Sequence, residues 1–211
     1  TYAAMVSAVD DGVGKLMETL RRQGLLEDTI VFFLSDNGGP ISKNASNNAP
    51  LRGAKSDLFE GGIRVPFAMQ WKGTIPAGQT YEEPIISLDI MATIAAITGV
   101  PISSDRPLDG VNLVPYLTRK KTGAPHEQLF WRKFEQQGMA VRSGSNKLVA
   151  NSQRQKHYAL FDLKTDIHED ENLRWKKPQI TKELVESWEI WNAQLKDRAF
   201  PTLMEDKWWE R

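Results

Sequence analysis

The sequence Ile-Val-Phe-Phe-Leu-Ser-Asp-Asn-Gly-Gly, at residues 30–39, determines which fold class this chain can adopt. Its first five residues form a continuous β-prone run, and an apolar run of that length without alternation fits a strand covered on both faces. A helix that ends at Gly24 as its C′ cap is predicted before it. Helix, short link and buried strand in that order are typical of an α/β sheet. The helix is predicted from apolar residues at helical spacing, namely Tyr2, Met5, Val6, Val9, Val13, Leu16 and Leu20.

Two sets of elements are expected downstream of this strand. A second strand is predicted within residues 65–71, and a helix that Ser87 or Asp89 caps is predicted to run to residue 97 and close at Gly99. From about residue 123 the pattern changes to short strands and one final helix with an apolar stripe. The predicted strands are 129–133, 139–143, 147–150 and 159–163, with a hairpin at 143–146 and the helix at 180–195.

The fold class expected from this order is α/β, in two parts. Residues 1–122 are predicted to form part of a mixed sheet flanked by helices. Residues 123–211 are predicted to form a small antiparallel sheet with one packed helix, in which Trp188 and Trp191 pack in the core.

Composition excludes several classes of protein. Lys and Arg number 27, as do Asp and Glu, so no net charge favours nucleic acid or an anionic membrane surface. The absence of cysteine excludes disulfides, thiolate zinc sites and cysteine nucleophiles within the chain. No apolar run approaches the length of about 18 residues that a membrane span needs. Thr1 is neither an initiator Met nor the start of a signal peptide, which favours a fragment.

Asp36 and Asn37 follow the strand after a single residue, Ser35, at the carboxyl end where open α/β sheets bind ligands. A carboxylate beside an amide carbonyl offers hard oxygen ligands, which suit Ca²⁺ or Mg²⁺ rather than zinc. Gly38 and Gly39 leave room for a ligand to approach. The alternative is a loop with Asx turns. Two ligands are also too few for a cation that takes about 6 to 8 oxygens, so the pair alone leaves both interpretations open.

Lys55 lies in a glycine-bearing loop near this pair, where an ammonium group can bind an anionic oxygen. The alternative is a solvated surface lysine, the usual environment of this residue. Glu60 and Arg64 are four residues apart and are predicted to pair and hold the loop, and Arg52 suits either role. A substrate can reach the loop beyond the metal pair, at Lys43, Asn47 and Asn48.

Several segments in one order resemble the formylglycine-dependent sulfatases of the alkaline-phosphatase-like superfamily. The first three are residues 24–39, then Pro-Leu-Arg-Gly-Ala-Lys at 50–55, then Glu-Gly-Gly-Ile-Arg-Val-Pro at 60–66. The later ones are 87–93, 109–117 and 160–173. Separate motifs in one order are far more specific than any one motif. The resemblance runs from Tyr2 to about Leu195 and covers the C-terminal portion of such a protein.

The resemblance implies roles for five residues. Asp36 and Asn37 would be ligands of an active-site divalent cation, Ca²⁺ more than Mg²⁺. Lys55 would act in catalysis by binding the sulfate group, and Arg52 and His126 would contact the substrate. The nucleophile of the family, a formylglycine made in a Cys/Ser-x-Pro/Ala-x-Arg motif, does not occur in this chain. It is expected upstream, so the chain alone is predicted to be inactive and to need the missing N-terminal part as its partner.

The implied activity is sulfate-ester hydrolysis on a sulfated carbohydrate or an aryl sulfate, in the periplasm or outside the cell. Neither nucleic acid nor a membrane span is expected. Trp131 is a candidate for stacking on a sugar ring. The alternatives are a non-catalytic sulfatase-like binding protein and a phosphate or phosphonate ester hydrolase of the same superfamily. The isolated chain is expected to expose an apolar sheet edge and to aggregate.

Overall fold

The computed structural model describes residues 1–133, 138–150 and 157–197, and the chain divides into two compact units. One unit comprises Thr1–Asp36 with Pro66–Glu127, and the other comprises Asn37–Val65 with Gln128–Arg211. The sequence predicted a contiguous division after residue 122, whereas residues 37–65 are grouped with the C-terminal sheet. The domain boundary itself stays a prediction. No helix in the described ranges has both the length and the apolar character that crossing a bilayer requires.

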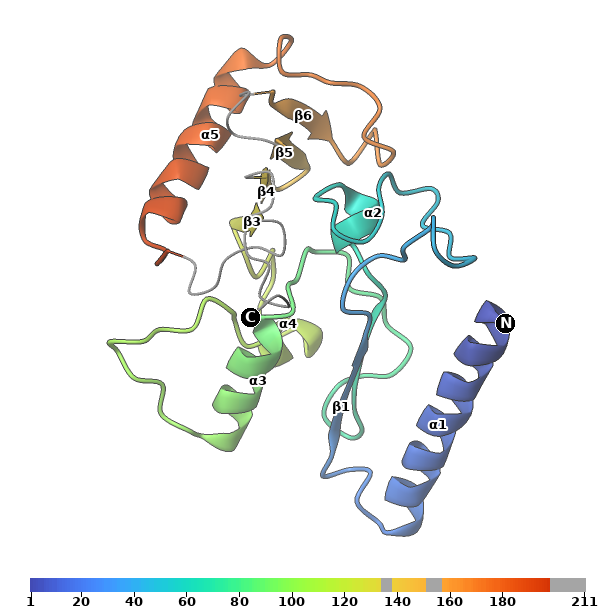
Figure 1. The fold of residues 1–211 in the computed structure, drawn as a ribbon. Helices are drawn as coiled ribbons and strands as arrows, with labels where there is room; N and C mark the ends of the chain where they lie inside the picture. The colour runs from blue at the N-terminus through green and yellow to red at the C-terminus, as the bar shows by residue number, and fades with distance from the viewer. Residues whose placement is uncertain (134–137, 151–156, 198–211) are drawn as a thin grey trace, which may run out of the picture. The chain divides into compact units, whose positions relative to one another are not determined.

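The first unit begins with α1 (Tyr2–Arg22), the predicted amphipathic helix. Gly24 has a φ of 69°, and its N–H donates to the carbonyl of Arg21, so the predicted glycine cap is confirmed. The chain then turns back into β1 (Ile30–Leu34), as Figure 1 shows.

Strand β1 pairs antiparallel with β2 (Phe67–Trp71), and both predicted strands are therefore confirmed. The expectation that β1 is covered on both faces is wrong for this structure. None of its five residues is buried, and Phe33 is 48% exposed. The reason is that, among the described residues, β1 has a single strand neighbour and sits at an open edge.

The rest of this unit is built around α3 (Asp89–Thr98), which ends at Gly99 with a φ of 69° as predicted. The expected cap is wrong, because Leu88 occupies the N-cap position and no side chain caps the helix. The Asp89 carboxylate instead accepts hydrogen bonds from the backbone N–H groups of Ile86 and Val111, each at 2.9 Å. A short helix, α4 (Val114–Leu117), follows.

The second unit contains a four-stranded antiparallel sheet in the order β3-β4-β5-β6. All four predicted strands and the final helix are confirmed. The tight turn at Gly144 between β4 and β5 is the predicted hairpin, with Ser143 paired to Asn146. The elements are β3 (Gln128–Lys133), β4 (Gly138–Ser143), β5 (Asn146–Ala150), β6 (Ala159–Asp162) and α5 (Pro178–Ala193).

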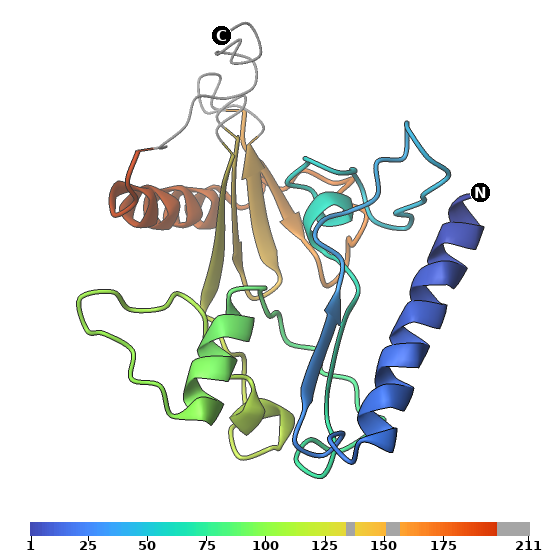
Figure 2. The ribbon, with the colours of Figure 1, turned by 60° about the horizontal axis from the view of Figure 1, so that its bottom comes forward.

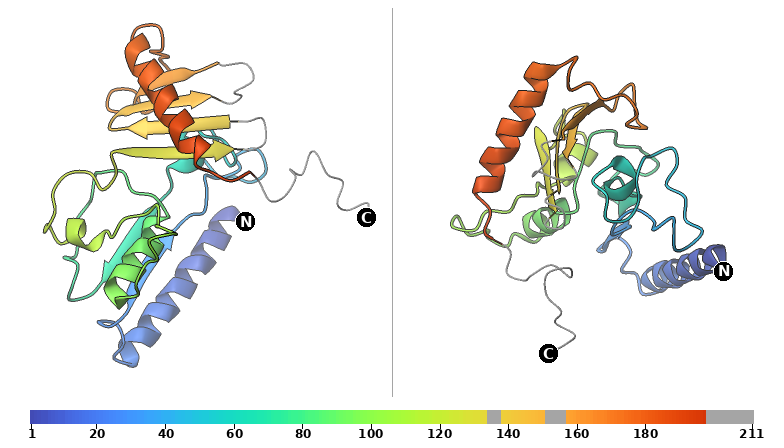
Figure 3. Two further views of the ribbon diagram at one scale, coloured as in Figure 1. Left: turned by 90° about the vertical axis from the view of Figure 1, so that its left-hand side faces the viewer. Right: turned by 45° about the horizontal axis from the view of Figure 1, so that its top comes forward.

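Helix α5 covers one face of this sheet, as the left view of Figure 3 shows. Leu184 and Trp188 are buried there against Leu148 of β5 and Leu160 of β6, which are direct cross-strand partners. Trp191 packs beside them and stacks on Phe130. Core packing of the two tryptophans is therefore confirmed.

Residues 37–65 cover the opposite face of the sheet. Leu58 packs against Ala140, Val149 and Phe161, and the short helix α2 (Glu60–Ile63) follows it directly. Figure 2 shows α2 and α5 on opposite sides of the strands. This three-layer arrangement anchors the loop that carries Arg52 and Lys55.

Candidate functional site

Three glycines let separate backbone segments touch below the candidate site residues. The N–H of Gly38 donates to the carbonyl of Gly62 at 3.0 Å. A Cβ on Gly38 would lie 1.7 Å from the oxygen of Gly61, and one on Gly62 would lie 2.2 Å from the oxygen of Asp57. Because no side chain fits at these positions, the segment after Asn37 and the start of α2 are held in direct backbone contact.

Asn48 fixes the loop from the other side. Its amide exchanges two hydrogen bonds of 3.0 Å with the N–H and carbonyl of Gly39, and its Nδ2 also donates to the carbonyl of Gly53 at 3.1 Å. The side chain thus acts as a substitute strand partner for the Gly39 peptide. The sequence placed Asn48 where a substrate could reach it, and its described contacts are those of a residue that shapes the loop.

Lys55 lies at the apex of a tight turn, residues 53–57, which we call the Lys55 turn. Gly53 and Ser56 both have positive φ angles, 89° and 76°. The Asp57 carboxylate accepts a hydrogen bond of 2.8 Å from the N–H of Ala54. The N–H of Lys55 donates to the carbonyl of Gly39 at 3.3 Å.

The backbone of the Lys55 turn is therefore fixed while the Lys55 side chain is exposed to solvent. The left-handed conformation of Ser56 costs of order 1 kcal/mol and persists because the surrounding contacts impose it. One of these contacts is the bond of 2.8 Å from Lys133 Nζ to the carbonyl of Ser56. A fixed turn that presents a solvent-facing ammonium group is suited to binding an oxyanion.

Asp36 and Asn37 are consecutive in the sequence. Asp36 ends the first segment of one unit, and Asn37 begins the first segment of the other. Asp36 is exposed and Asn37 is partly buried. Their carboxylate and amide oxygens fit a hard cation in kind. Among the described residues, no group of three or more His, Cys, Asp or Glu side chains is placed to hold a metal ion. These residues can therefore supply only part of a cation's coordination shell.

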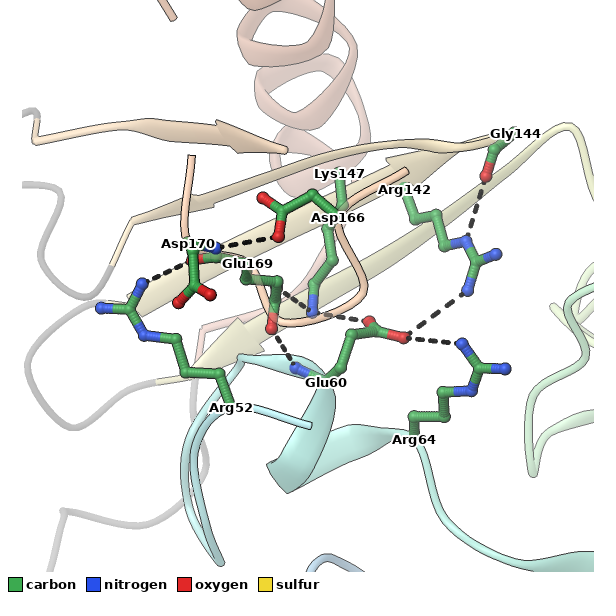
Figure 4. Close-up of polar contacts among 9 residues, drawn as sticks. All are labelled: Arg52, Glu60, Arg64, Arg142, Gly144, Lys147, Asp166, Glu169 and Asp170. Atoms are coloured by element: carbon green, nitrogen blue, oxygen red, sulfur yellow. Dashed lines mark hydrogen bonds and ion pairs between the residues drawn. The ribbon is translucent and has the colours of Figure 1, made fainter. Parts of the chain in front are cut away.

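A buried charge cluster, which the sequence did not predict as a whole, lies between α2 and the sheet (Figure 4). Lys147 Nζ is 2.7 Å from Glu60 Oε1 and 2.9 Å from Glu169 Oε1. The N–H of Glu60 also donates to Glu169 Oε2 at 2.6 Å. We call these three residues the Glu60–Lys147–Glu169 cluster. Burial raises the pKa of the Glu169 carboxyl, although the neighbouring Lys147 opposes the shift.

Two arginines complete the surroundings of Glu60. Nη1 of Arg64 and Nη1 of Arg142 each lie 3.8 Å from Glu60 Oε2. The predicted pair of Glu60 and Arg64 is thus confirmed. A signal for the larger cluster was present in the sequence, since Lys147 interrupts the apolar strand at 147–150 and a lysine in such a strand needs a buried carboxylate.

The structure gives Arg52 and His126 partners within their own units. Arg52 Nη1 donates to the carbonyl of Glu169 at 2.7 Å, and its guanidinium lies 4.2 Å from the centroid of the Phe59 ring. His126 Nε2 lies 2.8 Å from Asp89 Oδ1, with the side chains 9% and 0% exposed. These contacts orient both residues, and their predicted roles in substrate binding stay predictions.

Comparison with known proteins identifies the family. Residues 1–100 match the Sulfatase family model, and residues 54–194, more than half of the chain, match the model for N-sulphoglucosamine sulphohydrolase, C-terminal. The chain belongs to the sulfatase family. It corresponds to a C-terminal portion of a sulfatase of the alkaline-phosphatase-like superfamily, as the ordered motifs predicted.

Individual sulfatases show how much of the family this chain represents. It is 38% identical over 130 residues to the uncharacterized sulfatase YdeN of Escherichia coli (strain K12), which covers 62% of this chain and 23% of YdeN. It is 36% identical over 136 residues to human steryl-sulfatase, covering 61% and 23%. The chain thus spans about a quarter of the length of these relatives.

The crystal structure of Ps i-CgsB in complex with k-i-k-neocarrahexaose is similar over 97% of this sulfatase chain. It has a TM-score of 0.86 and 32% sequence identity, and the match covers 45% of that chain. The α/β fold class is confirmed by this similarity and by the two sheets.

Proposed function

We propose that this sulfatase chain is part of an enzyme that hydrolyses sulfate esters. Membership of the sulfatase family over more than half of the chain is the observation that carries the proposal. The geometry of the Lys55 turn supports it, because the backbone bond to Gly39 holds an exposed lysine beside the segment that begins with Asn37. The proposal also assigns roles to individual residues.

Lys55 binds a sulfate oxygen through its ammonium group and lowers the energy of the charge that develops on the sulfuryl group. Asp36 and Asn37 supply oxygen ligands to a divalent cation. Ca²⁺ is preferred to Mg²⁺ because a flexible set of protein oxygens suits the larger ion. Such a cation, when bound, polarises the sulfuryl oxygens. Arg52 and His126 contact the rest of the substrate. The nucleophile is a formylglycine supplied from outside these 211 residues.

The substrate we propose is a sulfated carbohydrate. Its support is the similarity to Ps i-CgsB, whose crystal structure holds a neocarrahexaose. The 36% identity to human steryl-sulfatase keeps an aryl or steryl sulfate as the second choice. Location in the periplasm or outside the cell belongs to the same proposal and rests on the family resemblance.

The roles are tested in the whole natural protein that contains these 211 residues, called the whole protein below. Lys55→Ala and Asp36→Ala are each expected to lower kcat on a sulfate ester by about 10²–10³-fold, as the loss of one charge-stabilising group does. Lys182→Ala, which removes an exposed lysine of α5 that has no proposed role, is the matched control and is expected to retain activity. Unchanged turnover in both Lys55→Ala and Asp36→Ala would refute the assignment of these residues.

A further inference from the structure

The Glu60–Lys147–Glu169 cluster joins three segments that are far apart in the sequence. Glu60 begins α2, Lys147 lies in β5, and Glu169 lies in the loop after β6. Lys147 contacts both carboxylates, and Glu169 also accepts the N–H of Glu60. Figure 4 shows Lys147 reaching from the sheet to the start of α2. The cluster therefore connects the sheet to the start of α2.

Packing alone does not explain why the three residues of this cluster are charged. Lys147 and Glu169 are 0% exposed and Glu60 is 2% exposed. A buried ion pair of this kind is often no more stable than apolar residues of similar volume, because desolvation offsets the attraction. Arg142 is the direct cross-strand partner of Lys147, which adds a like-charge contact unless a carboxylate lies nearby. Buried charges are best explained where they select one arrangement of the parts they join.

The cluster holds the start of α2, and the start of α2 contacts the Lys55 turn. Gly61 follows Glu60 directly, and its N–H donates to the carbonyl of Arg52 at 2.6 Å. The carbonyl of Gly62 accepts a hydrogen bond from the N–H of Gly38. The Cα of Gly62 also packs against the backbone of Asp57 in the Lys55 turn. A shift of Glu60 would move both glycines and so loosen the base of the Lys55 turn.

We propose that Lys147 is a positioning residue for the sulfate site. Through Glu60 it fixes the start of α2, and through Gly61 and Gly62 it fixes the Lys55 turn in the position that meets the sulfate group. The inference rests on the proposed function for its catalytic consequence, whereas its structural part is independent of any activity.

The structural part is tested by hydrogen exchange in the whole protein. Lys147→Met keeps a side chain of similar length without the charge, and the N–H groups of Lys55 and Gly61 are expected to exchange about tenfold faster in it. The matched control is Leu148→Ala, which weakens the same strand on its α5 face. An equal change at these two N–H groups in both variants, at equal global stability, would overturn the inference.

The catalytic part is tested by a double-mutant cycle on kcat/KM for a sulfate ester. Lys147→Met is expected to lower kcat/KM by about 10- to 100-fold in the presence of Lys55 and to have little further effect in the Lys55→Ala background. Additive losses would overturn the positioning role, because general destabilisation would act equally in both backgrounds.

Glu60→Gln serves as a second variant if Lys147→Met does not fold. It leaves Lys147 and Glu169 as a balanced pair and removes only the charge on α2. Faster exchange at Lys55 and Gly61 is again expected, and unchanged exchange would contradict the inference. If Lys55→Ala retains full activity while the exchange result holds, the proposed role of Lys55 fails and the structural role of Lys147 stands.

Discussion

At the scale of single residues, the backbone of the candidate site depends on glycines at positions where a side chain does not fit. The sequence predicted that Gly38 leaves room for a ligand. The structure shows a different requirement, because the carbonyl of Gly61 occupies the place where a Cβ would stand. That contact joins residues 23 positions apart in the sequence, so no local pattern predicts it. The cap at Gly24, by contrast, depends on its own helix and could be predicted.

Replacing Gly38 with Ala is expected to destabilise the whole protein by about 3 kcal/mol, because overpacking against backbone atoms cannot be relieved by a side-chain rotation. Gly14→Ala is the control, since no atom lies within 4 Å of its Cβ position and alanine favours the helix by about 0.5–1 kcal/mol. Urea unfolding measures both. Similar unfolding free energies for the two variants would contradict the close backbone contact.

Asp162 gives a prediction about pH. A side-chain hydrogen bond from Ser145, supported by Lys177, lowers the pKa of the Asp162 carboxyl below its ordinary value. A lowered pKa in the folded state stabilises the protein above the unfolded pKa, and this contribution is lost as the pH falls through the folded pKa. Asp162→Asn should therefore reduce the unfolding free energy at pH 7 by up to about 1 kcal/mol.

The Asp162→Asn difference should disappear as the medium becomes more acidic than the ordinary carboxyl pKa of 3.8, which denaturant titrations at several pH values can follow. A difference of constant size over the whole pH range would contradict the proposed charge interaction.

At the scale of elements, the sequence predicted the helices and strands that show a periodic apolar pattern or are bounded by a recognisable turn. Helix α5 shows an apolar stripe through Leu184 and Trp188, and the hairpin turn at Gly144 separates two short β-prone runs. The layer formed by residues 37–65 could not be predicted in this way. Leu58 packs against residues from three different strands, and Glu60 pairs with Lys147, from which it is separated by 87 positions in the sequence.

The contact between α5 and the sheet predicts a graded effect along one helix. Leu184→Ala is expected to cost about 2–5 kcal/mol, because it leaves a cavity against the strands. Ile190→Ala is the matched control on the same helix, since Ile190 is 67% exposed and such changes stay within about 0.5 kcal/mol. Thermal unfolding of the whole protein is the measurement. A loss at Ile190 as large as that at Leu184 would refute the assigned packing face.

At the scale of the whole molecule, the 211 residues leave much apolar surface exposed in their first unit. Phe33 on β1 and Met5, Val9 and Leu16 on α1 are all exposed. Exposed apolar strands and helix faces of this kind promote association. We expect the isolated 211-residue chain to self-associate with rising concentration and to show no sulfate-ester turnover. Sedimentation velocity and a turnover assay on the pure chain test this, and a monomer that hydrolyses the ester would contradict it.

The central claim, that this chain belongs to a sulfate-ester hydrolase rather than a phosphate-ester hydrolase or a binding protein, is tested by one assay. The whole protein and its Lys55→Ala variant are compared on an aryl sulfate and on the matching aryl phosphate. We predict that the whole protein hydrolyses the sulfate faster than the phosphate and that Lys55→Ala abolishes this preference with a loss of about 10²-fold or more. Faster hydrolysis of the phosphate, or hydrolysis of neither ester, would contradict the account.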